Sequence, residues 1–310
     1  MSFSQTAESW NKKGIYLSLG KSRLTVFYRS IGNIYAKPDE TLLILHGFPE
    51  SSYSFAKTLT HFESRFKRIV LFDFLGFGLS DKPKSGFNYS ILAHADTAEM
   101  LWRAVSVQGG HLVCHDMATS VGTELLYRQE LGVLKCFKAF KSITFTNGSM
   151  AIDFTKLRIA QKILLNKTTG PYFSVLVNKV IFNHQIKSAH GNDRLSREDI
   201  DDMWSYMAHN GGKKISHLII QYYRDRMKYE KTRWLPCLQH AKIPIHLCWG
   251  ADDQVAPLDM VNYLSESICP QAKLTILDGA GHFPHIGSPD TWSQKVLSFY
   301  SELTTESKNT

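Results

Sequence analysis

The sequence predicts a mostly parallel, doubly wound α/β sheet with an inserted helical cap, on three observations. Short apolar runs alternate with longer helical stretches along most of the 310 residues, as they do in βα units. At the start, residues 14–19 and 24–29 alternate apolar and polar side chains around Gly20-Lys21, which fits two antiparallel strands. From about 149 to 236 the strand-like runs stop and helical periodicity remains.

Six short apolar runs are expected to form the parallel strands, because continuous apolar runs fit strands that helices cover on both faces. These runs are Leu42–Leu45, Ile69–Phe72, Leu112–Cys114, Ile143–Phe145, Ile245–Trp249 and Leu274–Leu277. The helical stretches between and after them span roughly 53–61, 90–106, 117–131, 258–268 and 290–303.

These elements divide the chain into a core and an insertion. Residues 1–148 and 237–303 are expected to form the two parts of the core, and residues 149–236 the helical cap. Residues 304–310 are expected to be a disordered tail.

Composition and charge exclude several classes of protein. With 43% apolar and 21% charged residues, the chain is neither disordered nor of low complexity. Its five cysteines are scattered, which fits neither a disulfide framework nor a zinc site. No apolar window approaches the ~18 residues of a spanning helix, and the first residues lack the pattern of a signal peptide. A cytoplasmic protein, monomeric or homodimeric, is therefore expected.

The net charge of +8 is concentrated in the cap. Residues 151–240 contain 15 Lys and Arg against 8 Asp and Glu, a difference of 7. A solvated helical surface explains this excess, and attraction to an anionic membrane or an acidic partner is the alternative. Nucleic acid is not an expected partner, because no recognition motif accompanies the charge.

Two loops follow the first parallel strands. His46-Gly47-Phe48-Pro49 leaves the carboxyl end of the first run, where ligands bind in open α/β sheets; a plain βα turn is the alternative. The loop from Asp73 to Pro83 is rich in glycine but lacks the spacing of a phosphate loop, so a structural role is expected.

The segment from His111 to Gly122 carries the central motif. An apolar strand runs directly into a helix, and Asp116 stands between two small residues, Cys114 and Ala118. A nucleophile elbow needs small residues two positions before and after the nucleophile, because strand and helix approach closely there. The alternative is that Asp116 only caps the helix.

Two later strand ends favour the elbow. Trp249 to Asp253 places acids after one strand, and Gly279 to His282 places a histidine after the next. The chain order of nucleophile, acid and histidine is that of a nucleophile-elbow triad.

On these residues, and on the segments HGFPESSYSF, LFDFLGFGLSDKP and ELLYR, the chain resembles the α/β-hydrolase family along nearly its whole length. It is similar to the branch with an aspartate nucleophile, which includes epoxide hydrolases and haloalkane dehalogenases. The resemblance implies that Asp116 is the nucleophile, Asp253 (rather than Asp252) the triad acid and His282 the base. The backbone N–H groups of Phe48 and Met117 would form the oxyanion hole.

A carboxylate nucleophile suits displacement at a saturated carbon, as in an epoxide or an alkyl halide, better than attack on an ester. In dehalogenases, side chains just after the nucleophile and in the HGNP loop donate N–H groups to the halide. This chain has Met117 and Phe48 there, which donate none, so a dehalogenase is disfavoured.

Epoxide opening needs an acid, which cap tyrosines supply in epoxide hydrolases. Ile220-Gln221-Tyr222-Tyr223-Arg224 resembles the cap motif that carries one of them. This implies Tyr223 as the proton donor, with Tyr222 as the fallback, and ring packing is the alternative role. The other residues expected to contact substrate from the cap are Tyr172, Tyr206 and Trp204.

The leading hypothesis is a hydrolase without cofactor or metal that converts a small or medium apolar epoxide to a diol. His282 and His285 have a metal-compatible spacing, but no cluster of carboxylates or cysteines accompanies them. A dehalogenase or lactone-cleaving enzyme is one alternative. Another alternative is a non-catalytic binding or membrane-associated protein of this fold. The residues Cys114, Met117 and Ala118 support this alternative, because they depart from the residues usual at these positions in the branch that the chain resembles.

Overall fold

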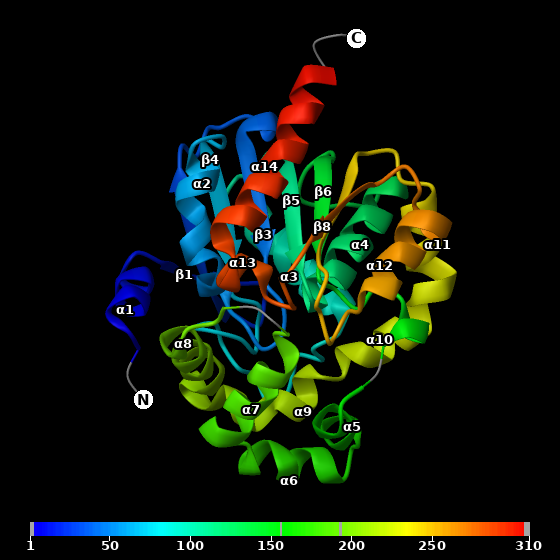
Figure 1. Ribbon diagram of the computed structural model, residues 1–310. Helices are drawn as coiled ribbons and strands as arrows, with labels where there is room; N and C mark the ends of the chain where they lie inside the picture. Colours follow the sequence, from blue (N-terminus) through cyan, green and yellow to red (C-terminus); the bar gives the residue numbers. More distant parts are fainter. Residues whose placement is uncertain (1–2, 156, 192–193, 307–310) are drawn as a thin grey trace.

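The computed structural model describes residues 3–155, 157–191 and 194–306, and it contains an eight-stranded sheet (Figure 1). The strands are β1 (Ile15–Leu19), β2 (Leu24–Gly32), β3 (Thr41–Leu45), β4 (Arg68–Phe72), β5 (Gly110–His115), β6 (Phe140–Thr146), β7 (Ile245–Gly250) and β8 (Lys273–Leu277). Their spatial order is β1-β2-β4-β3-β5-β6-β7-β8. The pairs β1–β2 and β2–β4 are antiparallel and all others are parallel. The fold class predicted from the sequence is confirmed.

The strand order reverses between β3 and β5, because β4 lies on one side of β3 and β5 on the other. In open α/β sheets, ligands bind outside the carboxyl ends of the strands at such a switch point. The loop that begins at His46 and the turn at Asp116 leave these two strand ends. The topology alone therefore brings the two predicted motifs together.

The sheet is covered on both faces, which explains the continuous apolar runs. Leu43 and Leu45 pack into one apolar cluster together with α3 (Ile91–Ala104) and α4 (Met117–Glu130). Leu42 and Ile44 pack into a second cluster on the opposite face. That second cluster includes residues of α1 (Gln5–Lys12), α2 (Leu59–Glu63) and α14 (Pro289–Glu306).

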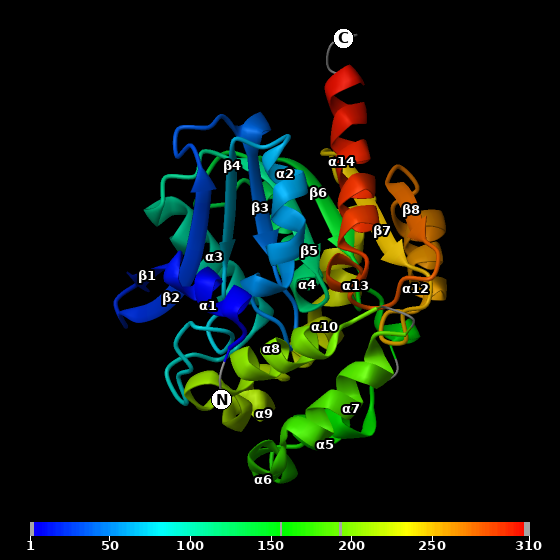
Figure 2. The same ribbon diagram turned by 60° about the vertical axis from the view of Figure 1, so that its left-hand side comes forward.

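Helices between β6 and β7 form the cap, which lies at the carboxyl ends of the strands, opposite the end of α14 (Figures 1 and 2). They are α5 (Ile159–Leu165), α6 (Thr169–Leu176), α7 (Lys179–Ala189), α8 (Arg197–Ala208), α9 (Ser216–Ile219) and α10 (Tyr222–Tyr229). Helix α11 (Leu235–Gln239) then lies beside α4 on the way back to the sheet (Figure 1). Periodicity alone does not show where these helices are divided. Asn178, for example, accepts hydrogen bonds from the N–H groups of Val180 and Ile181 and so begins α7.

Three details differ from the sequence predictions. Helix α1 was not predicted; Ser4 caps it and also donates to Asp202 of α8, so a tertiary contact fixes it. The predicted helix at 53–61 is a 3₁₀ segment over Ser52–Thr58 followed by α2. Helix α14 continues through Glu306, so residues 304–306 are helical, whereas 307–310 lie outside the described residues. Within the described chain, no helix has the length and apolar character needed to cross a membrane.

The contact between β5 and α4 depends on one small residue. A Cβ atom added to Gly122 would lie 2.5 Å from Sγ of Cys114 and 3.2 Å from the ring of Phe145. The absence of a side chain at position 122 therefore lets α4 approach the strand that leads to Asp116.

We expect Gly122→Ala to lower the free energy of unfolding by ~1–3 kcal/mol, because it overpacks a buried contact. Adding Cys114→Ala should restore part of this loss, since it removes the sulfur that the new methyl group meets. Urea unfolding of the wild type, both single variants and the double variant measures the coupling between the two positions. If the change in the free energy of unfolding of the double variant equalled the sum of the two single changes, helix and strand would not be in contact at these positions.

Candidate active site

Asp116 sits in a strained turn between β5 and α4. Its backbone has φ 47° and ψ −113°, a region that non-glycine residues occupy only when the surroundings enforce it. The Asp116 N–H donates to the carbonyl of Thr146 (3.3 Å), and the Thr119 hydroxyl donates to the carbonyl of Asp116 (2.7 Å). The Asp116 side chain makes no capping bond to α4. This geometry is that of an elbow and not of a helix cap.

The loop after β3 closes over Asp116. The backbone N–H of Phe48 donates to Oδ2 of Asp116 (2.9 Å). A Cβ atom at Gly47 would lie only 2.5 Å from Cβ of Asp116, so this approach requires glycine. His46 fixes the loop: its Nε2 accepts from the Phe74 N–H (3.0 Å), and its Nδ1 therefore carries the proton and donates to the carbonyl of Gly47 (2.8 Å). Burial lowers the pKa of His46, consistent with a neutral ring.

His282 is held by Asp253. The Nδ1 of His282 donates to Oδ2 of Asp253 (2.8 Å), which also accepts from the Asn147 side-chain amide (2.8 Å). The second oxygen, Oδ1, accepts from the N–H groups of Val255 (2.6 Å) and Ala256 (2.9 Å). The Asp253 carboxylate is thus buried but has four donors, which is what a buried anion requires.

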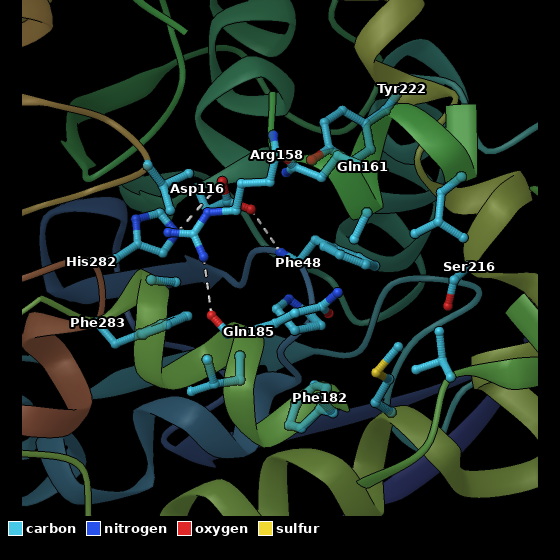
Figure 3. Close-up of a pocket in the computed structure, with 18 residues that line it drawn as sticks. Phe48, Asp116, Arg158, Gln161, Phe182, Gln185, Ser216, Tyr222, His282 and Phe283 are labelled. Carbon is cyan, nitrogen blue, oxygen red and sulfur yellow. Dashed lines mark hydrogen bonds and ion pairs between the residues drawn. The ribbon is translucent and has the colours of Figure 1, made fainter. Parts of the chain in front are cut away.

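The other ring nitrogen of His282 faces Asp116, with Nε2 3.9 Å from Oδ1 (Figure 3). Burial lowers the pKa of His282, but Asp253 and then Asp116 raise it more, and the net result is a pKa of about 9. At neutral pH, His282 is therefore an imidazolium between two carboxylates. Its charge depends in part on the negative charge of Asp116.

A second buried cluster lies beneath this pair. Glu50 accepts from Nδ1 of His115, from Nε2 of His285 (2.7 Å) and from the N–H of Gly47 (3.1 Å). Burial opposes the charge of Glu50, but the two histidines hold its pKa well below the usual range. Nε2 of His115 faces the carbonyl oxygen of His282 (2.7 Å). Both ring nitrogens of His115 therefore lie within hydrogen-bond distance of an acceptor.

The cluster of Glu50, His115 and His285 also has the residue types and spacing of a metal site. Its ligand atoms, however, already satisfy one another through the hydrogen bonds above. Burial lowers the pKa of His285 to about 4, so this ring is neutral and donates through Nε2. The cluster therefore works as a brace that links the loop after β3, the elbow and the loop of His282.

Asp116 and His282 form part of the wall of a pocket of about 110 Å³ between the sheet and the cap (Figure 3). Its wall is mainly apolar, with Phe48, Leu164, Val177, Phe182, Ile186, Met207, Val255 and Phe283 among the lining residues. The polar side chains that the cap contributes are those of Arg158, Gln161, Gln185, Ser216 and Tyr222.

Of the five cap residues predicted to contact substrate, Tyr222 alone is among those that line this pocket. Tyr223 is buried but does not line the pocket, since neighbouring residues of a helix point about 100° apart. Tyr172 is exposed. Tyr206 is buried against α1, where its hydroxyl donates to Oδ1 of Asn11, and Trp204 packs on Phe182 behind the wall. Of the two adjacent tyrosines, Tyr222 and not Tyr223 therefore faces the pocket.

Tyr222 is placed by a buried arginine that the sequence did not single out. The guanidinium of Arg226 lies 4.9 Å from the centre of the Tyr222 ring. Its Nε donates to the hydroxyl of Ser120 (2.9 Å), and it reaches the carbonyl of Asp116 (3.4 Å). Burial raises the pKa of Tyr222, and the charge of Asp116 raises it further.

Arg158 was also not predicted. Its guanidinium donates to the carbonyls of Gln185 (3.1 Å) and Ser188 (2.7 Å) at the end of α7, where a helix favours positive charge. The same side chain forms part of the pocket wall beside Asp116 and His282 (Figure 3). A cation in a cap helix has no distinctive sequence pattern, so only the fold reveals this placement.

The fold and the site define the class of protein. The model of the alpha/beta hydrolase fold family matches residues 40–289, and the chain belongs to this family. A putative hydrolase of Mycobacterium tuberculosis, LipZ, is 34% identical over 278 residues, covering 87% of this chain and 92% of that protein. The human mesoderm-specific transcript homolog protein is 31% identical over 305 residues, covering 97% and 89%.

Among solved structures, a haloalkane dehalogenase loop variant from Bradyrhizobium elkanii superposes with a TM-score of 0.75. The superposition covers 96% of this chain and 98% of that one, at 16% sequence identity. At this identity the likeness shows the shared fold and leaves the chemistry to the residues of the site.

The raised pKa of His282 predicts a pH dependence of stability. Because the pKa of His282 is higher in the folded state than in the unfolded state, protonation of His282 stabilises the fold. This stabilisation is complete at pH values below the unfolded pKa of about 6.5, and it is lost as the pH rises through about 9. We expect the free energy of unfolding to fall between these values by ~2–3 kcal/mol more in the wild type than in His282→Gln. Chemical denaturation at pH 6, 7, 8 and 9 measures this, and parallel curves for the two proteins would contradict it.

Proposed function

We propose that the protein is an epoxide hydrolase that uses Asp116 as nucleophile and forms an alkyl-enzyme ester. The observation that carries the proposal is the buried arrangement of Asp116, His282 and Tyr222 in one apolar pocket. A carboxylate is already ionised at neutral pH and needs no base in order to attack. The protonated state of His282 in the free protein is therefore no obstacle to the first step.

In the first step, an oxygen of Asp116 attacks an epoxide carbon and the carbon–oxygen bond of the ring breaks. The phenol of Tyr222 gives its proton to the leaving alkoxide. This assignment to Tyr222 follows from its place in the wall and from the effect of the Asp116 charge on its pKa. Once Asp116 is an ester, that charge is gone, so the phenolate of Tyr222 is easier to form.

In the second step, the same loss of charge prepares His282. Asp116 contributes to the raised pKa of His282, so esterification lowers this pKa, and His282 passes its proton through solvent to the phenolate of Tyr222. Neutral His282, oriented by Asp253, then takes a proton from water, and the hydroxide attacks the carbonyl carbon of the ester. The tetrahedral intermediate collapses to the diol and the Asp116 carboxylate, and His282 keeps the proton from water, which restores the starting protonation states.

The oxyanion of the second step is proposed to lie on two backbone N–H groups. That of Phe48 already donates to Oδ2 of Asp116. Met117 is the first residue of α4, where backbone N–H groups lack helical partners. Removing one such donor typically lowers the rate ~10²–10³-fold.

An alkyl halide is the less favourable substrate for this site. A leaving halide needs N–H donors opposite the nucleophile, and the side chains of Phe48 and Met117 provide none. The phenol of Tyr222 is an acid, which an alkoxide needs and a halide does not. The geometry therefore favours epoxides within the group of reactions that an aspartate nucleophile performs.

The His282→Gln variant should trap the ester, because Asp116 can still attack while water is no longer activated. We expect incubation with a panel of apolar epoxides to add the mass of one epoxide to the intact protein, and peptide mapping to place it on Asp116. A parallel panel of haloalkanes distinguishes the two leaving groups.

The control is the double variant His282→Gln/Asp116→Asn, which should show no adduct. If neither panel modifies His282→Gln, or the adduct lies on another residue, the proposed nucleophile is wrong. If only the haloalkanes formed an adduct, we would conclude that the substrate is an alkyl halide and not an epoxide.

The adjacent tyrosines provide a matched pair of variants. Tyr222→Phe should lower the rate of epoxide opening ~10²-fold or more, the usual contribution of a positioned acid. Tyr223→Phe should change it less than about threefold, since Tyr223 is not among the residues that line the pocket. Single-turnover formation of the ester in the His282→Gln background isolates this step. The reverse order of effects would assign the proton to Tyr223.

A further inference from the structure

The outer surface of the cap exposes several large apolar side chains in a short stretch. On α6, Tyr172, Val175 and Leu176 are 74%, 56% and 65% exposed, and their spacing of three and four residues places them on one side of the helix. Val180, in the first turn of α7, is 77% exposed, and Ile159, at the start of α5, is 78% exposed. We call these five residues the outer cap face. Helix α6 is the part of the cap farthest from the sheet (Figures 1 and 2).

The inner surface of the same helices is apolar as well. Leu164 of α5 and Phe182 and Ile186 of α7 line the pocket. A helix that is apolar on both sides is usually covered on both sides. The sheet and pocket cover the inner side, so the outer cap face lacks a partner within the described chain.

The charged residues of the segment that carries the outer cap face are all positive. Residues 157–191 contain five Lys and Arg and no Asp or Glu. Lys162, Lys167 and Lys187 are exposed, and within the described residues none of them forms an ion pair. Lys179 pairs with Asp201 of α8 (2.8 Å). The Nζ of Lys213 donates to the carbonyls of Val175 and Val177 at the end of α6, which places a further positive charge there.

We propose that the outer cap face docks on the surface of an anionic lipid bilayer. Exposed apolar residues interleaved with lysines on short helices are the pattern of segments that lie in a membrane interface. The apolar side chains would enter the boundary of the acyl chains, and the lysine stems would extend so that their charges reach the anionic headgroups. The proposal concerns binding and does not depend on the proposed reaction.

In this orientation, the pocket lies on the opposite side of the cap helices from the lipid. Helices α5 and α7 separate the outer cap face from the pocket, so the path from the bilayer to Asp116 crosses only the thickness of the cap. An apolar substrate dissolved in lipid would reach the pocket through this layer. The same positive surface would repel cationic partners and attract the bilayer at low ionic strength.

Co-sedimentation of the full-length protein with vesicles tests the proposal. We expect vesicles of phosphatidylcholine with 30% phosphatidylserine, a fraction large enough to supply the anionic surface potential, to bind at least about tenfold more protein than pure phosphatidylcholine. Leu176→Ser/Val180→Ser should reduce binding at least about fivefold. The matched control is Leu131→Ser/Val133→Ser, which removes two apolar residues that are 57% and 53% exposed and follow α4 at the other end of the sheet.

A charge variant, Lys162→Gln/Lys167→Gln/Lys187→Gln, gives a second measurement that leaves the apolar residues in place. It should reduce the preference for phosphatidylserine and the sensitivity of binding to salt. Thermal melting shows whether each variant is folded. Equal binding of the Leu176/Val180 and Leu131/Val133 variants would overturn the proposal, as would a lack of vesicle binding by the wild type.

If the outer cap face instead mediates self-association, sedimentation velocity without lipid will show a dimer that the Leu176/Val180 variant loses, and this result also overturns the proposal.

Discussion

The negative charge of Asp116 is the feature on which the site depends. It lies 3.9 Å from Nε2 of His282 and raises the pKa values of both His282 and Tyr222. In the proposed reaction, esterification of Asp116 therefore changes the acid–base state of two other groups. The ring of His282 becomes neutral before it is needed as a base, and the phenol of Tyr222 becomes easier to ionise. No movement of the chain is required for this change.

The two other buried carboxylates of the site are both hydrogen-bonded. Asp253 has four donors, and Glu50 has three. These carboxylates come from loops after β7 and β3, and the histidines that they hold come from the ends of β5 and β8 and from the helical turn that follows. An unpaired buried charge would cost several kcal/mol, so the loops can pack only in an arrangement that pairs these carboxylates. The requirement for pairing thus positions the loops as well as the side chains.

The sequence predicted the sheet, the elbow and the positions of the acid and the histidine, since each depends on a local pattern. Six apolar runs marked the strands β3 to β8, alternating apolar and polar residues marked β1 and β2, and the small residues around Asp116 marked the turn. The choice between Tyr222 and Tyr223 could not be made in this way. It depends on where α10 begins, and no glycine or proline precedes it at residues 220 and 221. Arg226, Asn147 and the partners of Glu50 were missed because their roles exist only after distant loops converge.

The hydrogen bond between Arg226 and Ser120 has a consequence for how the cap moves. Arg226 belongs to α10 and Ser120 to α4, so this bond fastens the tyrosine-bearing part of the cap to the helix that begins at the nucleophile. That part cannot swing outward without breaking a buried bond and exposing a charge. Helices α5 to α7 make no such connection to α4 in the described chain. An outward movement of α5 to α7 would therefore leave the bond between Arg226 and Ser120 intact, and with it the relative position of α10 and Asp116.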